Sequence, residues 1–312
     1  MLRDSPNTES EETPRRTVNR RTVLQGMAGG AAIMSGLPLM SERATATVAE
    51  AQCLTAMSAP SDYPVVEKQE DLLGGSEFVE HGTFPQGADE VLIYVHGWLE
   101  LFTGGAGDQG YTLQTALEQN GYTHPTITFK YPSNNPNWWG VQDAAEEDGR
   151  AFASWLEDYR EQNPNTTVRM IGHSLGARTG LGCLDELVNE NGHAPVRSFG
   201  MIGGAINQSA VTTDGEFGAT IASGAEEVNN YYSKHDNILN EIFQLGQFGP
   251  EAVGAYGAPL FGDTPSNYYD HDVAESVKGH CLYYKPDKGC VPRIVANFPP
   301  GNQEGDDDWW PF

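Results

Sequence analysis

The chain has 312 residues, and its 43 acidic against 18 basic side chains give it a formal net charge of −25. This charge excludes nucleic acids and anionic membranes as partners that bind by electrostatic attraction. The length is typical of one large domain, and compact apolar runs such as 91–95 can build a buried sheet. We therefore expect a single folded domain without a nucleic-acid partner.

The acidic residues are spread over the whole chain, and only six of the basic residues are lysines. This composition resembles that of proteins from salt-loving archaea, and an ordinary acidic soluble protein is the alternative. Concentrated salt would screen the repulsion among these charges, because the Debye length falls to about 3 Å near 1 M salt. The composition therefore predicts a halophilic protein.

The N-terminal segment has the pattern of an export address. Residues 1–19 are polar and lack apolar periodicity, so we expect them to be disordered. Arg20 and Arg21 then precede an apolar stretch rich in Gly and Ala, and residues 20–46 resemble a twin-arginine signal peptide. The stretch has about 15 residues, fewer than the ~20 that span a bilayer, and small residues near Ala46 suit cleavage. We expect an extracellular or cell-surface protein.

Two other interpretations of this segment involve the membrane. The apolar stretch can remain as an uncleaved anchor, although Pro38 and the short length argue against this. A lipid can be attached to Cys53, although the residues before it match a lipobox poorly. A membrane is expected as a partner only through one of these two attachments.

Export would permit disulfide bonds among the four cysteines. Cys281 and Cys290 form the most economical pair, because the segment between them resembles a turn. Cys183 lies in an expected helix and is interpreted as a small buried hydrophobe. None of the cysteines stands in a Cys/His catalytic motif.

Short apolar runs alternate with helical patterns from about residue 60 onward. This alternation predicts an α/β fold with a mostly parallel central sheet and helices on both faces. The domain is expected to span residues 60–295, followed by an acidic and aromatic tail, 296–312, that has no interpretation. Strands are expected at 91–95, 126–131, 167–171, 196–202 and 228–233 and helices at 111–120, 141–160 and 172–187, with loops and short helices at 236–272.

A sharp turn is expected at Gly172-His173-Ser174-Leu175-Gly176. An apolar strand precedes this G-x-S-x-G string, and a helix with regularly spaced leucines follows it. In this context the string exposes a nucleophilic serine, because the residues around so tight a turn must be small. Gly172 and Gly176 meet that requirement, and Ser174 is the candidate nucleophile.

This motif, with His96-Gly97-Trp98 after the 91–95 strand, makes the chain resemble the lipase- and esterase-like serine hydrolases of the α/β-hydrolase superfamily. The resemblance covers roughly residues 88–285 and implies the α/β-hydrolase fold. It implies an oxyanion hole made by the backbone N–H groups of Leu175 and Trp98, with His173 and Gly97 in support. His96 precedes the nucleophile in the chain, so we interpret it as a structural hydrogen-bonding residue.

The resemblance also implies a catalytic acid and base that follow the serine in the order Ser, acid, His. Asp236, just after the expected strand at 228–233, is the candidate acid, and Asp214 and Asp263 are weaker substitutes. His280, which follows a glycine, is the preferred base. His271, between two aspartates, is the alternative, and it also fits a surface histidine or part of a cation site.

The implied reaction is hydrolysis of a carboxylic ester through an acyl-enzyme, with a small-molecule ester or a lipid as substrate and with no cofactor or metal. A peptidase or acyltransferase with the same triad, and a non-catalytic binding protein with the same fold, are the alternatives. Aromatic side chains that can line an acyl pocket, or equally pack in a core, are Trp138, Trp139, Phe243, Phe248 and Phe261.

The acidic surface generates a prediction about stability. Lowering the salt concentration from about 1 M to about 0.01 M lengthens the Debye length from about 3 Å to about 30 Å, so repulsion among the carboxylates returns. We expect the midpoint of thermal unfolding, followed by circular dichroism, to fall by several degrees. An equal midpoint at the two salt concentrations would show that the charge is an ordinary acidic surface.

Overall fold

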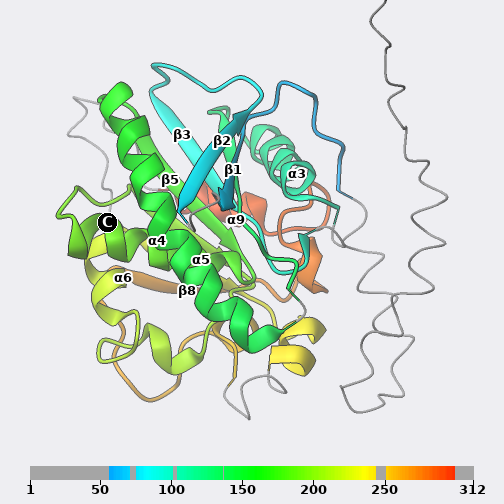
Figure 1. Ribbon diagram of the computed structural model, residues 1–312. Helices are drawn as coiled ribbons and strands as arrows, with labels where there is room; N and C mark the ends of the chain where they lie inside the picture. The colour runs from blue at the N-terminus through cyan, green and yellow to red at the C-terminus, as the bar shows by residue number, and fades with distance from the viewer. Residues whose placement is uncertain (1–55, 71–74, 101–103, 136, 244–250, 299–312) are drawn as a thin grey trace, which may run out of the picture. The chain divides into compact units, whose positions relative to one another are not determined.

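The computed structural model describes residues 56–70, 75–100, 104–135, 137–243 and 251–298 (Figure 1). All of them belong to one structural unit, Ala46–Phe312. The expected disordered segment 1–19, the signal peptide 20–46, Cys53 and residues 299–312 of the tail lie outside the described residues. The export signal and its cleavage therefore stay predictions.

The core of the unit is an eight-stranded sheet in the order β2-β1-β4-β3-β5-β6-β7-β8. Neighbouring strands are parallel except for β1 and β2, which form an antiparallel pair at one edge. The strands are β1 (Val65–Glu70), β2 (Ser76–His81), β3 (Glu90–Val95), β4 (Thr126–Lys130), β5 (Thr167–His173), β6 (Ser198–Ile202), β7 (Val228–Tyr232) and β8 (Tyr268–Asp272).

Helices cover both faces of this sheet (Figure 1). One apolar cluster joins the sheet to α4, α5 and α6, and a second joins it to α3 and α9. Among the described residues, none of the helices is both long and apolar enough to span a membrane. The α-helices are α3 (Ala106–Gln119), α4 (Trp138–Gln162), α5 (Gly176–Leu184), α6 (Gly218–Gly224), α8 (Val253–Tyr256) and α9 (Val291–Ala296), and helical turns of other types are η2 (Asp185–Glu190), η3 (Gln208–Val211), η4 (Leu239–Phe243) and η5 (His280–Leu282).

The apolar run at residues 91–95 of the central strand β3 is explained by burial on both faces of the sheet. Val91, Ile93 and Val95 belong to the first cluster, whereas Leu92 and Tyr94 belong to the second. Successive side chains of a strand point to opposite faces, so a strand buried on both faces needs apolar residues at every position. The expected α/β-hydrolase fold, with a mostly parallel sheet between two helical layers, is confirmed.

The sequence does not predict β1, β2 or β8. For β8 the prediction of loops and short helices over 236–272 is wrong. β8 reads Tyr-Tyr-Asp-His-Asp, and only Tyr268 is buried. Likewise, β2 contains no fully buried residue. Both strands lie at an edge of the sheet, where side chains face solvent and the apolar pattern that marks an inner strand is missing.

The expected disulfide between Cys281 and Cys290 is wrong. Cys290 is a free thiol that donates a hydrogen bond to the carbonyl oxygen of Tyr283. Cys281 is disulfide-bonded, but not to Cys290. Cys183 is free and fully buried in α5, as expected, and burial raises the pKa of its thiol to about 12.

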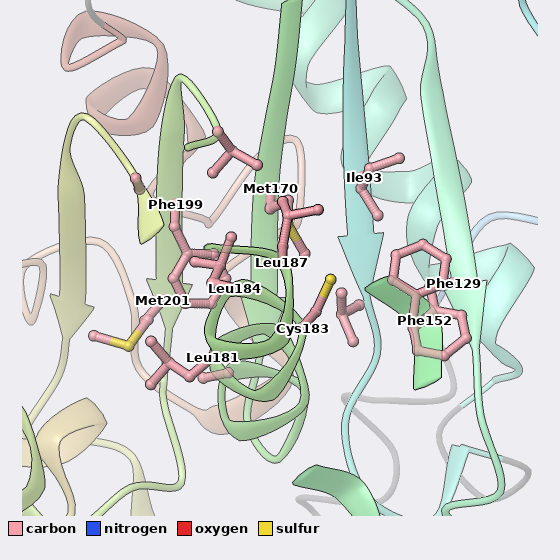
Figure 2. Packing of buried hydrophobic residues seen from close by; sticks show 14 of the residues in the cluster. Ile93, Phe129, Phe152, Met170, Leu181, Cys183, Leu184, Leu187, Phe199 and Met201 are labelled. Atoms are coloured by element: carbon pink, nitrogen blue, oxygen red, sulfur yellow. The ribbon is translucent and has the colours of Figure 1, made fainter. Parts of the chain in front are cut away.

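Helix α5 carries the expected nucleophile turn at its start and is buried along its length. Figure 2 shows Leu181, Cys183 and Leu184 gathered around this helix beside the strands that carry Met170 and Phe199. All of these side chains are at most 1% exposed. Helix α5 is therefore fixed by packing against the centre of the sheet.

The neighbouring helix α4 approaches α5 closely because glycines lie at their crossing. A methyl group added at Gly149 of α4 would overlap the backbone oxygen of Thr179 in α5, and one added at Gly182 would overlap that of Glu146. Each helix thus removes a side chain where the backbone of the other passes. A methyl group added at Gly140, near the start of α4, would meet only the side chain of Asn137, at 3.0 Å.

This packing predicts opposite effects for two substitutions in one helix. Gly149→Ala should lower the free energy of unfolding by about 1–3 kcal/mol, because the helices must separate. Gly140→Ala should leave stability unchanged or raise it by up to about 1 kcal/mol, since Ala has the higher helix propensity. Urea unfolding of the two variants measures both values, and equal stabilities would contradict the close helix crossing.

Candidate active site

The turn between β5 and α5 holds Ser174 in a strained backbone conformation. Its φ is +56°, in the left-handed region that non-glycine residues rarely adopt. The serine N–H donates to the carbonyl oxygen of Ile202 at 3.1 Å, and its own carbonyl accepts the N–H groups of Ala177 and Ala205. Neighbouring elements thus fix the strained residue, a state that typically persists at functional sites.

The two glycines of the motif are required by close backbone approaches. A methyl group at Gly172 would lie 2.7 Å from the Cα atom of Ala177 in the first turn of α5. One at Gly176 would overlap the carbonyl oxygens of Val95 and His96 at the end of β3. The expected small residues around the turn therefore have a direct steric reason.

Asp236 follows β7 at the same edge of the sheet and is fully buried. Its Oδ1 atom accepts the N–H of Leu239 at 3.0 Å. Its Oδ2 atom lies 2.7 Å from Nδ1 of His280, in η5. Both the candidate acid and the preferred histidine thus meet in one hydrogen bond, although 44 positions separate them.

This hydrogen bond sets the proton arrangement of His280. A carboxylate only accepts, so Nδ1 carries the hydrogen and the lone pair is on Nε2 when the ring is neutral. The described residues form no hydrogen bond between the Ser174 hydroxyl and this nitrogen. Catalytic hydrogen bonds are often long without substrate and shorten when it binds.

His173 links the serine turn to the loop of His280. Its ring is 3% exposed and lies 4.8 Å from the ring of His280, centroid to centroid. Its Nε2 atom is 2.9 Å from the backbone oxygen of His280, so this nitrogen carries the hydrogen and donates it. Burial holds the pKa of His173 well below its usual value, so the ring is neutral and serves as an uncharged link.

The other candidate acids and base lie elsewhere. His271 is in edge strand β8, where its Nε2 atom is 2.7 Å from Oδ1 of Asn229 and its ring stacks on Tyr231. The backbone oxygen of Asp263 accepts the N–H of Thr213 in a surface loop. Asp214 lies one residue further on in that loop. None of these three makes a described contact with Ser174, Asp236 or His280.

The loop after β3 lies against the serine. A methyl group at Gly97 would be 2.8 Å from the Cβ atom of Ser174, so the loop backbone passes directly beside the nucleophile. Neither the N–H of Trp98 nor that of Leu175 has a hydrogen-bond partner among the described residues. Both backbone N–H groups therefore lack an acceptor within the described part of the chain.

His96 holds this loop in place. Its Nε2 atom accepts the N–H of Tyr131 at 3.1 Å, so its Nδ1–H donates to the carbonyl oxygen of Gly97 at 2.8 Å. The rings of His96 and Tyr131 stack, with their centroids 4.4 Å apart. Burial lowers the pKa of His96 to about 4, so the ring is neutral and acts as a hydrogen-bonding support.

The candidate pocket aromatics separate into different environments. Trp138, at the start of α4, packs edge to face against Trp98 at 5.1 Å between ring centroids. Trp139 is 48% exposed and Phe261 is 91% exposed, so these two side chains face solvent. Phe248 lies outside the described residues. Trp98 and Trp138 thus form an aromatic pair at the loop that follows β3.

Tyr283 belongs to the site although no sequence motif predicts it there. Its hydroxyl is 3.3 Å from Oδ2 of Asp236 and 3.1 Å from the carbonyl oxygen of Gly254 in α8. Tyr283 lies three positions after His280. This spacing indicates a shared site only once it is known that the η5 turn connects the two residues. The carboxylate therefore has a second side-chain partner.

Solved structures of esterases resemble this chain at low sequence identity. A Pyrobaculum calidifontis esterase is 14% identical, with a TM-score of 0.46 over 86% of this chain and 96% of its own. An esterase from Rhizomucor miehei is 15% identical, with a TM-score of 0.48 over 87% of this chain and 95% of its own. A thermophilic carboxylesterase cloned from a metagenomic library is 13% identical, with a TM-score of 0.44 over 84% and 99%. At these values the likeness assigns no activity to this chain.

In sequence, no curated protein matches the chain. A family model does match, over residues 109–295. The matched region begins in α3 and includes the serine turn, Asp236 and His280. Because this match covers more than half of the chain, the protein belongs to the family described as "Protein of unknown function (DUF726)".

Proposed function

We propose that the protein is a serine hydrolase that cleaves carboxylic esters through an acyl-enzyme. One observation carries the proposal: the 2.7 Å hydrogen bond between Asp236 and His280, beside a serine held at φ +56°. A buried carboxylate that fixes a histidine, near a serine on a strained strand-to-helix turn, is the arrangement that activates a hydroxyl nucleophile. The proposed nucleophile, acid and base are Ser174, Asp236 and His280.

In the proposed reaction, Nε2 of His280 removes the proton of the Ser174 hydroxyl. Oγ forms a bond to the ester carbonyl carbon, and the carbonyl π electrons move to its oxygen. The tetrahedral intermediate then expels the alcohol, which takes the proton from the imidazolium. Water, deprotonated by the same histidine, attacks the carbonyl carbon of the acyl-enzyme. The bond from that carbon to Oγ then breaks, the acid is released, and the imidazolium returns its proton to Oγ of Ser174. Asp236 stays ionised and stabilises the imidazolium.

The negative oxygen of each tetrahedral intermediate needs donors that are already in place. We assign this role to the open N–H groups of Leu175 and Trp98. Loss of one such donor typically slows the reaction by about 10²–10³-fold. His96 and Gly97 would support the hole by fixing the loop backbone, and His173 would connect it to the loop that bears the base.

The proposed substrate is a small-molecule ester or a lipid, bound near Trp98 and Trp138. The twin-arginine route would place this reaction at the cell surface or in the medium, where high salt would screen the acidic surface. No step of the proposed reaction calls for a cofactor or metal ion, since the nucleophile, the base and the oxyanion donors are all groups of this chain.

The first prediction concerns the triad. Ser174→Ala and His280→Ala should each lower kcat for p-nitrophenyl esters by at least about 10³-fold, and Asp236→Asn by a similar factor. The assay is run in high salt with esters of graded chain length, and the chain-length profile separates a carboxylesterase from a lipase.

His271→Ala is the matched control, because this histidine contacts Asn229 and Tyr231 rather than the triad. We expect it to keep the activity of the native chain. If His271→Ala abolished turnover and His280→Ala did not, the assignment of the base would be wrong. A native chain that cleaves peptides or transfers acyl groups, with little turnover of simple esters, would be a peptidase or an acyltransferase instead.

A second prediction concerns the loop beside the nucleophile. Gly97→Ala should lower kcat/KM by about 100-fold, because the methyl group displaces either Ser174 or the loop. Gly204→Ala is the control: its methyl group would meet Ala177 and Val253 at ordinary contact distances of 3.4 and 3.5 Å. Similar kinetics for the two variants, at similar melting temperatures, would contradict the close approach of the loop.

A further inference from the structure

The carboxylate of Asp236 is fully buried and receives three hydrogen-bond donors. The N–H of Leu239 lies 3.0 Å from Oδ1, whereas Nδ1 of His280 and the hydroxyl of Tyr283 lie 2.7 and 3.3 Å from Oδ2. A buried charge is stable only when such donors replace the water it has lost. Tyr283 and His280 therefore share one oxygen atom of the carboxylate.

The hydroxyl of Tyr283 has one proton and two acceptors within reach, Oδ2 of Asp236 and the carbonyl oxygen of Gly254 at 3.1 Å. The Gly254 carbonyl already accepts the N–H of Ser233 at 3.0 Å. The carboxylate is charged, and hydrogen bonds to charged acceptors are about twice as strong as neutral ones. The proton is therefore directed at Asp236.

We propose that Tyr283 is a positioning residue that holds Asp236 in place and limits the basicity of His280 through a hydrogen bond to the oxygen atom they share. This inference rests on the proposed function, because it assigns the basicity of the proposed base. A donor on Oδ2 withdraws negative charge from the atom that stabilises the imidazolium.

Within the described part of the chain, one further titratable ring packs against that of His280. From β5, the neutral ring of His173 packs against it and donates to its backbone oxygen. Lys285, five positions after His280 in the chain, lies over the ring of Tyr284, with its Nζ atom 5.1 Å from the ring centroid, and burial lowers the pKa of its ammonium group to about 8. Asp236 is thus the carboxylate that contacts His280 directly, so a change at its Oδ2 atom should dominate the titration of the ring.

The next residue in the chain provides a matched control. Tyr283 and Tyr284 are both fully buried. The hydroxyl of Tyr284 has no hydrogen-bond partner within the described part of the chain, and its ring lies edge-on to His173. Removal of the Tyr284 hydroxyl takes away an equally buried group that does not touch the carboxylate.

The closing experiment measures the pKa of His280 by NMR titration of isotope-labelled histidine in full-length protein that carries Ser174→Ala, with the signal assigned by its loss in His280→Gln. Tyr283→Phe should raise this pKa by about 0.5–1 pH unit, because the carboxylate loses a donor and attracts the imidazolium more strongly. Tyr284→Phe should leave it unchanged. An unchanged pKa in Tyr283→Phe would overturn the proposal and place the proton on Gly254.

A second variant covers the case in which Tyr283→Phe does not fold. 3-Fluorotyrosine at position 283 keeps the ring and the hydroxyl but is a stronger donor, so the pKa of His280 should fall. A rise or no change would overturn the proposal. Because these titrations need no turnover, they remain decisive even if the chain proves not to hydrolyse esters.

Steady-state kinetics in the serine-containing protein test the consequence for catalysis. Tyr283→Phe should lower kcat at neutral pH by roughly tenfold with little change in KM, since the hydroxyl positions the acid and lies away from the substrate. The acid limb of the kcat profile should move to higher pH by the same shift that NMR shows. A uniform loss of kcat at every pH would indicate a purely structural role and contradict the proposal.

Discussion

The parallel alignment of the central strands is the constraint on which the candidate site depends. In parallel strands all carboxyl ends meet at one edge, and the loops that follow them converge there. β3 leads into the Gly97 loop, β5 into Ser174 and β7 into Asp236, and His280 follows β8 at the same edge. Residues separated by as many as 183 positions, from Gly97 to His280, therefore lie within one network of close contacts.

Burial then decides how these residues behave. Asp236, His96 and His173 lie in the interior, where an unpaired polar group is costly. Most of their polar atoms are paired: Asp236 receives three donors, and His96 joins Tyr131 to the Gly97 loop. Because the rings of His96 and His173 are kept neutral, His280 is left as the histidine whose proton arrangement suits a base.

The same packing explains why the serine turn can be strained. Ser174 has a φ of +56° and lies between β5 and a helix that the sheet core and α4 enclose. Close backbone contacts at Gly172 and Gly176 leave the turn little freedom to relax. The cost of the strained residue is met by the burial of α5, whose apolar side chains gain more on folding than one φ angle costs.

Much of the fold and of the serine turn could be predicted from the sequence, because strand periodicity and the steric requirements of a tight turn depend on residues that are close together in the chain. The apolar run of β3 predicts a strand buried on both faces, and the glycines around Ser174 predict the turn. The chain order of Ser174, Asp236 and His280 also follows from the sequence. In contrast, β2 and β8 were missed, since edge strands carry polar residues that leave no apolar pattern.

Only the tertiary structure could decide which distant groups meet. Cys290 was expected to pair with Cys281 because the two are close in sequence, yet its thiol lies against the oxygen of Tyr283 and stays free. The choice between His271 and His280, and the hydroxyl of Tyr283 on Asp236, depend on the fold of the chain beyond β7. Local pattern determines which elements form, whereas contacts between residues far apart in sequence depend on how those elements pack.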